Sequence, residues 1–191
     1  MNSLDELRMF KQFIHAAEQV WTQIATSPRG KPVYTIDRVD YAPLPERYNS
    51  KRKISRIFRR YWGRQLTETM IRNLKLRLIK GKLCVPYGAI PPLPTTIQSL
   101  QLKMNRPNQK VVSAVLYGAS KKVRVDYRLI RVGAAAPYTI MKRSGKEFDQ
   151  RYRQPAKATG PQAKPKPTPT QKTPGKPKHK SNGRKKLLKT P

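Results

Sequence analysis

The sequence predicts an α+β fold: a long N-terminal helix, a short basic helical pair and an antiparallel three- to four-stranded meander, followed by a disordered C-terminal tail. Apolar residues recur at helical spacing in the first part of the chain, and from Ser99 onward they alternate with polar residues, as in strands. From Gln154 onward the chain has no aromatic and almost no aliphatic residue, so it buries too little apolar area to offset the entropy lost on folding. We therefore expect a basic domain over residues 1–143, a linker over 144–153 and a tail over 154–191.

The charge of the chain narrows its choice of partners. Of its 191 residues, 42 are Lys or Arg and 10 are Asp or Glu, which gives a net charge of +32. Such a chain attracts polyanions at long range, and nucleic acid is the commonest partner, ahead of an anionic membrane surface. No apolar run is long enough to span a bilayer, and the N-terminus has the pattern of neither a secretory signal nor a transit peptide. These features predict an intracellular protein, in the cytoplasm or with the nucleoid or nucleus.

The sequence offers little chemistry for catalysis. Cys84 is the only cysteine, which excludes an internal disulfide, and with only His15 and His179 it does not complete a structural zinc site. No P-loop, dinucleotide fingerprint, GxSxG elbow or HExxH occurs. We expect no enzymatic activity, no cofactor and no metal.

Three acids keep one enzymatic alternative open. Asp37, Asp40 and Glu46 lie close together in the sequence and could hold a divalent ion, as a metal-dependent nuclease requires. Acids without a supporting Lys or His motif more often pair with surrounding Arg and Lys, and we favour that interpretation here.

The N-terminal helix is predicted over residues 4–25. Ser3 and Glu6 have the spacing of a capping box, and Ser27-Pro28 ends the periodic pattern. This helix carries far less excess charge than the later segments, so its apolar stripe is interpreted as a core face or as a subunit interface. The residues that would form a homo-oligomer are Leu7, Phe10, Phe13, Ile14 and Trp21. Residues 33–41 follow as a predicted strand.

The central segment predicts two helices. Ile54, Ile57, Phe58 and Tyr61 recur at i, i+3, i+4 and i+7, which places one apolar stripe on a helix that begins after Asn49 or Ser50 and ends near residue 62. The basic residues then face the other side. After the turn at 63–65, a second helix capped by Thr67 is expected to continue to about residue 80.

The helical pair has a helix-turn-helix outline, in which Arg72 and Lys75 would face a DNA groove. A competing interpretation is a hairpin over 74–87, because Leu74, Leu76 and Leu78 alternate with charged residues. We favour the helix.

The C-terminal half of the domain predicts a meander. Residues 88–94 are a proline-rich connector. Two alternating segments, near 100–104 and 123–129, flank a short apolar run at 111–117, and 138–142 adds an edge strand. One sheet face is apolar, and the other carries Lys122, Arg124 and Arg128. Tyr127 lies on the apolar face by phase, which argues against base stacking on the basic face.

The favoured function is non-enzymatic binding of DNA or RNA through phosphate contacts, which the basic tail supplements. In composition the tail resembles those of linker histones, and this resemblance implies phosphate neutralisation without sequence reading. The expected contact residues are Arg52, Lys53, Arg56, Arg59, Arg60, Arg64, Arg72, Lys75, Lys122, Arg124 and Arg128. The alternative is an assembly protein, ribosome-associated or viral, that oligomerises through the N-terminal helix and packages nucleic acid.

Overall fold

The computed structural model describes residues 3–28, 32, 34–90, 92–118, 120–146 and 149–154. Over these residues the fold is α+β, as predicted, with three α-helices and two antiparallel sheets. Residues 1–155 form one compact unit. The expected tail beyond residue 154, and the side chain of Ser3 in the expected capping box, lie outside the described residues.

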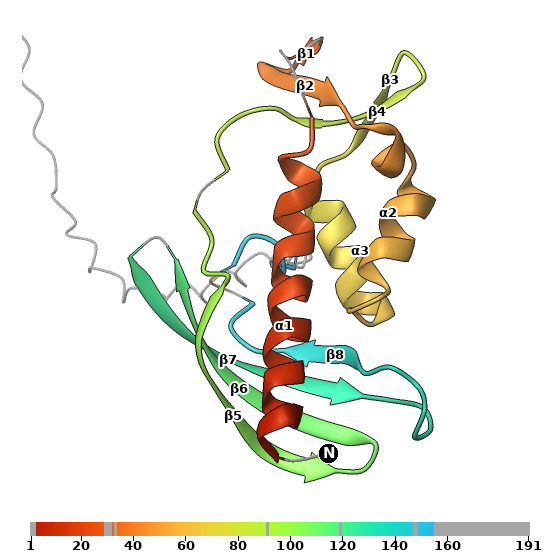
Figure 1. Ribbon diagram of the computed structural model, residues 1–191. Helices are drawn as coiled ribbons and strands as arrows, with labels where there is room; N and C mark the ends of the chain where they lie inside the picture. Colours follow the sequence, from red (N-terminus) through yellow and green to blue (C-terminus); the bar gives the residue numbers. More distant parts are fainter. Residues whose placement is uncertain are drawn as a thin grey trace, which may run out of the picture. The chain divides into compact units, whose positions relative to one another are not determined.

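Helix α1 (Ser3–Ala25) packs lengthwise against the larger sheet (Figure 1). Its stripe is the core of the protein: Phe10, Ile14 and Trp21 are buried, and Leu7 and Phe13 are half-buried. The indole N–H of Trp21 donates to the carbonyl of Met70 at 3.2 Å. The face that we considered for a homo-oligomer is therefore occupied by the protein's own chain.

The larger sheet is the predicted meander. Its strands are β5 (Thr96–Arg106), β6 (Gln109–Gly118), β7 (Lys121–Ile130) and β8 (Thr139–Arg143), paired antiparallel in that order. Val125, Tyr127 and Leu129 of β7 are buried on the face toward α1, so the prediction for Tyr127 is confirmed. The intervening residues point to the outer face.

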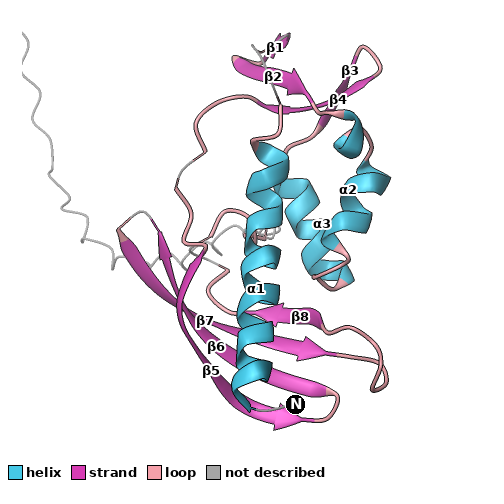
Figure 2. Cartoon of the chain, in the orientation of Figure 1, coloured by secondary structure: helices cyan, strands magenta, loops and turns pink. Residues whose placement is uncertain are grey.

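The smaller sheet corrects two predictions. It consists of β1 (Tyr34–Ile36), β2 (Val39–Pro43), β4 (Lys82–Pro86) and β3 (Arg77–Ile79), in that spatial order (Figure 2). The predicted single strand over 33–41 is a hairpin, and the helix expected to reach residue 80 is wrong, since 77–86 form the competing hairpin. Both turns place two consecutive residues at positive φ, Asp37-Arg38 and Lys80-Gly81, which matches the twist of tight hairpins.

Helices α2 (Lys51–Phe58) and α3 (Arg64–Asn73) form the predicted pair, after a short 3-10 helix, η1 (Glu46–Tyr48). Ser50 caps α2, as expected, by accepting the N–H of Lys53 at 3.2 Å. The helix ends at Phe58 rather than near residue 62, and α3 begins after Gly63 rather than at Thr67. The reason is a tertiary contact: Ile140 of β8 bonds to both Tyr61 and Gly63 through the backbone, at 2.7 and 2.9 Å, and draws this turn out of helical geometry.

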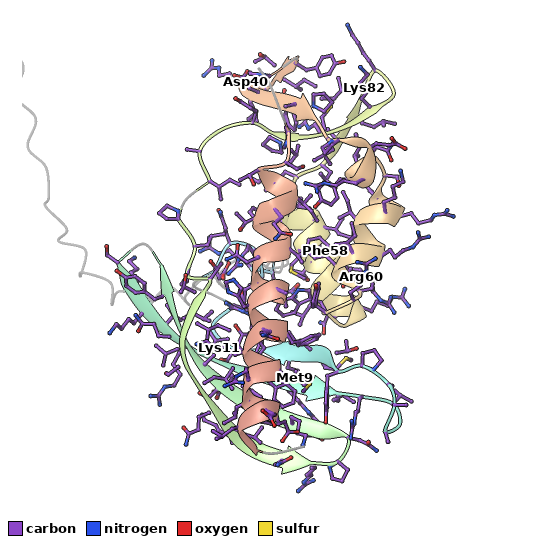
Figure 3. All side chains as sticks on the ribbon, viewed as in Figure 1. Met9, Lys11, Asp40, Phe58, Arg60 and Lys82 are labelled. Carbon is purple, nitrogen blue, oxygen red and sulfur yellow. The ribbon has the colours of Figure 1, made fainter. Side chains whose placement is uncertain are left out.

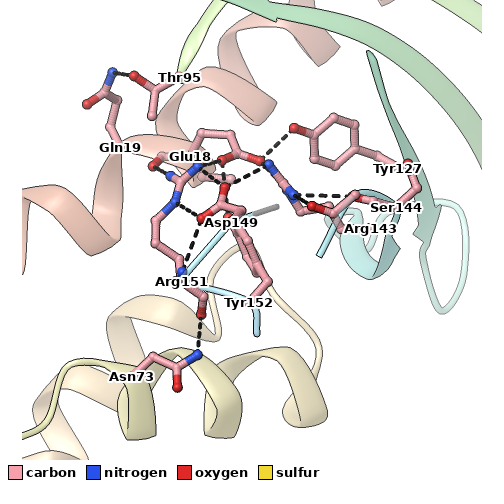
Figure 4. A network of polar contacts seen from close by, with 12 residues as sticks. Glu18, Gln19, Asn73, Thr95, Tyr127, Arg143, Ser144, Asp149, Arg151 and Tyr152 are labelled. Atoms are coloured by element: carbon pink, nitrogen blue, oxygen red, sulfur yellow. Dashed lines mark hydrogen bonds and ion pairs between the residues drawn. The ribbon is translucent and has the colours of Figure 1, made fainter. Parts of the chain in front are cut away.

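Four buried charges tie the two ends of the folded unit together (Figure 4). The Glu18 carboxylate pairs with Arg143 at 2.8 Å and with Arg151 at 2.7 Å. Asp149 pairs with the same two guanidinium groups, at 3.2 and 2.7 Å. The hydroxyl of Tyr127 donates to Glu18 at 2.6 Å. Two negative and two positive groups thus compensate each other in a site closed to solvent.

The network also redefines the end of the domain. Arg151 and Tyr152 are fully buried, and Asp149 nearly so. Asn73 on α3 donates to the carbonyls of Arg151 and Arg153, each at 3.0 Å. Residues 149–154, which we expected within or next to a linker, therefore belong to the compact unit that ends at 155.

The protonation states in this network follow from its charges. Burial alone would raise the pKa of Glu18, but the charges of Arg143 and Arg151 outweigh it, so that the pKa lies below the ordinary 4.5. Burial and the negative charge of Glu18 raise the pKa of Tyr127 and of Tyr152. Glu18 therefore stays ionised at neutral pH, while both phenols stay protonated and donate hydrogen bonds.

We expect Glu18→Gln to destabilise the protein by about 3 to 5 kcal/mol, because it leaves two buried guanidinium groups undercompensated. The free energy of unfolding in urea measures the loss. Glu68→Gln is the matched control, since Glu68 forms only an exposed pair with Arg64, and it should change stability little. Equal stability of the two variants would contradict the importance of the network.

The lowered pKa of Glu18 predicts that the free energy of unfolding decreases at acidic pH. Because the folded-state pKa of Glu18 lies below its unfolded-state value, near 4.5, its ionisation contributes stability above that pH. The contribution is lost as pH falls through the folded-state pKa. We expect the unfolding free energy of the wild type to fall more steeply than that of Glu18→Gln below pH 4.5. Parallel profiles would contradict this assignment.

Candidate nucleic-acid interface

Helix α2 has one buried and one exposed side. Ile54 and Phe58 are fully buried, which fixes the rotation of the helix against α1 and α3. The exposed basic side chains of α2 and of the turn that follows it are Lys51, Arg52, Arg56, Arg59 and Arg60. Figure 3 labels Phe58 and Arg60, two residues apart, one in the interior and one on the surface. We refer to these five exposed residues as the α2 basic surface.

The α2 basic surface has almost no internal compensation. Among the described residues, no carboxylate pairs with Arg52, Arg56, Arg59 or Arg60. Glu68 is the acid on the adjacent helix, and it pairs with Arg64 at 2.8 Å. Lys53 is half-buried and donates to the backbone carbonyl of Glu46 at 2.9 Å. The field of this surface is therefore directed to solvent, where a polyanion can meet it.

A shallow groove brings residues of α2 and α3 together. Arg52, Arg72 and Lys75, all expected contact residues, lie along it with Ile71 at its side. The complete lining is Lys51, Arg52, Ser55, Glu68, Ile71, Arg72, Lys75 and Leu76. Ser55, Ile71 and Leu76 were not predicted from the sequence to line a contact site, because their place at the groove depends on how the two helices pack.

Lys75 occupies an unusual backbone position. It follows the end of α3 with a φ of 51°, the left-handed conformation that normally selects glycine after a helix. Its side chain is exposed, so a lysine stands at a strained position beside the groove. Backbone strain of this kind is often found at functional positions.

Helix α3 is held on several sides. Leu66 and Met70 are buried, and Asn73 binds the C-terminal segment. Arg64 begins the helix, Arg72 lies in its last turn, and Lys75 lies beyond it. The expected placement of Arg72 and Lys75 on one helix is therefore corrected, although both line the same groove.

The remaining expected contacts lie elsewhere. Lys122 and Arg124 are exposed on the outer face of β7, and Arg128 is half-buried there with a hydrogen bond to Gln109 at 3.3 Å. This face is also partly compensated, since Lys103 pairs with Asp126 at 3.1 Å. Ser113 and Lys103 help to lower the pKa of Asp126. Helix α1 covers the inner face of the larger sheet, and α2 packs on α1. Lys122, Arg124 and Arg128 lie on the outer face of that sheet and therefore form a surface separate from the α2 basic surface.

The acids considered for a metal do not gather. Asp37 pairs with Arg77 at 3.0 Å, and Asp40 accepts from the hydroxyl of Thr35 at 2.7 Å. Within the described part of the chain, no three His, Cys, Asp or Glu side chains are placed to hold an ion together. Burial raises the pKa of the Cys84 thiol. The nuclease alternative therefore finds no support in this geometry.

Comparison with known proteins gives no family assignment: no family model matches the chain, and no curated protein matches it in sequence. Among the described helices, none combines the length and the apolar character needed to cross a bilayer.

The strain at Lys75 is testable. We expect Lys75→Gly to be more stable than Lys75→Ala by about 1 kcal/mol, because only glycine adopts a positive φ without a steric penalty. Both variants lose the same charge, so their difference in urea unfolding isolates the backbone effect. An alanine variant as stable as the glycine variant would contradict the left-handed assignment.

Proposed function

We propose that this protein is a non-enzymatic nucleic-acid-binding protein, and that the α2 basic surface and the adjacent groove contact phosphates. The observation that carries the proposal is the set of exposed α2 arginines without described carboxylate partners. Guanidinium groups bind phosphate oxygens through charge-assisted, often bidentate hydrogen bonds. A folded helix and the turn after it therefore hold several such groups at the surface, where they can follow a phosphate chain.

The energetic basis is the release of counterions. Each phosphate neutralised by Arg or Lys frees bound cations from the nucleic acid, so affinity falls linearly with the logarithm of salt concentration. Because the contacts proposed here involve phosphates, binding should depend weakly on base sequence. The proposal extends to DNA and RNA alike.

The assembly alternative has less support. It required the apolar stripe of α1 as a subunit interface, but Phe10, Ile14 and Trp21 are buried within the protein itself. The proposal therefore rests on binding rather than on oligomerisation through α1.

Replacing Arg56, Arg59 and Arg60 together by Gln should weaken binding and flatten its salt dependence. Each lost phosphate contact lowers the slope of log K against log salt by about 0.7 to 0.9. Fluorescence anisotropy with labelled single-stranded and duplex oligonucleotides, at several salt concentrations, measures both quantities. Circular dichroism should be unchanged, because all three side chains are exposed.

A variant with the same change in charge serves as the control. Lys121, Lys122 and Arg124 are exposed on the sheet, and their joint replacement by Gln should affect binding less than the α2 variant does. Equal losses of affinity in both variants would show that binding depends only on the net charge of the protein. Unaltered binding by the α2 variant would remove this helix from the proposed interface.

A further inference from the structure

A second hollow lies between α1 and the β7–β8 connection. It has a volume of about 300 Å³ and a largely apolar wall. Its lining residues are Glu6, Met9, Phe10, Phe13, Arg131, Ala136, Pro137 and Tyr138. Figure 3 shows Met9 on the opposite side of α1 from Lys11, and Met9 is 36% exposed at this hollow. The size is at the lower end of small-ligand sites.

The aromatic groups of this hollow are held in place by one another. Phe10 and Tyr138 meet edge to face with ring centroids 5.3 Å apart. The guanidinium carbon of Arg131 lies 5.0 Å from the centroid of the Tyr138 ring. Its Nε and Nη1 donate to the carbonyls of Pro107 and Ala134, both at 2.9 Å. Phe10 is buried and supports Tyr138 from within, so the accessible groups are the half-buried Phe13 and Tyr138 rings and the Arg131 guanidinium. Aromatic rings and guanidinium planes are the groups on which unstacked bases pack in protein complexes.

The hollow adjoins the C-terminal end of the α2 basic surface. Tyr61, the residue after Arg60, contacts Phe13 with ring centroids 5.4 Å apart. The backbone of Ile140, two residues after Tyr138, bonds to Tyr61 at 2.7 Å. The residues that wall the hollow are thus tied directly to the turn that follows Arg59 and Arg60.

The charge in the hollow is compatible with a nucleotide. Among the described residues that line it, Glu6 is the only acid, and it pairs with Lys110 at 2.8 Å. Its charge is therefore compensated within the protein, and Arg131 adds a positive group. A base could enter without bringing its phosphate next to an unpaired carboxylate.

We propose that this hollow accepts one unstacked nucleobase while neighbouring phosphates lie on Arg59 and Arg60. The inference rests on the proposed nucleic-acid binding and gives it a preference for single strands, because a base in an intact duplex is unavailable for such insertion. The α2 basic surface attracts the phosphates, and the hollow adds a contact with a base that a sugar-phosphate chain without bases does not make.

The test compares a labelled single-stranded oligo-dC with an abasic strand of the same length, by fluorescence anisotropy with the full chain. The base-bearing strand should bind roughly 5-fold to 150-fold more tightly, the range expected for stacking of one base on an aromatic group. Ala136→Leu, which narrows the hollow, should reduce this advantage while leaving the affinity for the abasic strand unchanged. Ala135→Leu, an exposed neighbour outside the lining, should keep the full advantage.

A second variant guards against misfolding of Ala136→Leu. Met9→Glu places a carboxylate at a side chain that is already 36% exposed, and it should also reduce the advantage of the base-bearing strand. Equal affinity of the wild type for both strands would overturn the base site without contradicting the proposal that the α2 basic surface binds phosphates. An undiminished advantage in both folded variants would also overturn it. Failure of both strands to bind would overturn the proposed function itself.

Discussion

The buried carboxylate of Glu18 is the constraint on which the domain depends. An ionised group in the interior is tolerated only when it is paired and hydrogen-bonded, and its partners come from β8 and from the segment around Arg151. These elements must be in place together, because an incomplete network leaves a buried charge without compensation. The first helix and the last described residues therefore fold as one structure, although they are far apart in the sequence.

The scarcity of acids then shapes the surface. The chain has 10 acidic residues for 42 basic ones, and Glu18, Asp149 and Glu6 are used in buried or half-buried pairs. Few carboxylates remain to compensate cations outside, and none of the described ones pairs with the exposed α2 arginines. The few acids are thus used to compensate charges in the interior. The same distribution leaves the α2 basic surface without compensating carboxylates.

The sequence predicted what depends on local periodicity and missed what depends on distant partners. It predicted α1, the cap at Ser50 and the meander, because each has a pattern within a few neighbouring residues. The helix extended to residue 80 was wrong, since Leu, Lys and Arg favour helices while the strained turn at Lys75 and the hairpin are set by packing. Glu18 carried a usable signal, an acid four residues after Ile14 on the apolar stripe, but nothing local identified its partners.

The two basic surfaces differ in how they can act on a ligand. On the outer sheet face, Asp126 already pairs with Lys103, and Arg128 is half-buried against Gln109. A phosphate arriving there must compete with these contacts. The α2 basic surface offers exposed groups without described carboxylate competitors, and it adjoins a hollow lined by aromatic rings. The turn after α2 bonds directly to β8, but the sheet cations Lys122 and Arg124 are exposed on the outer face. Under the proposed function, the α2 basic surface is therefore the one that binds phosphates.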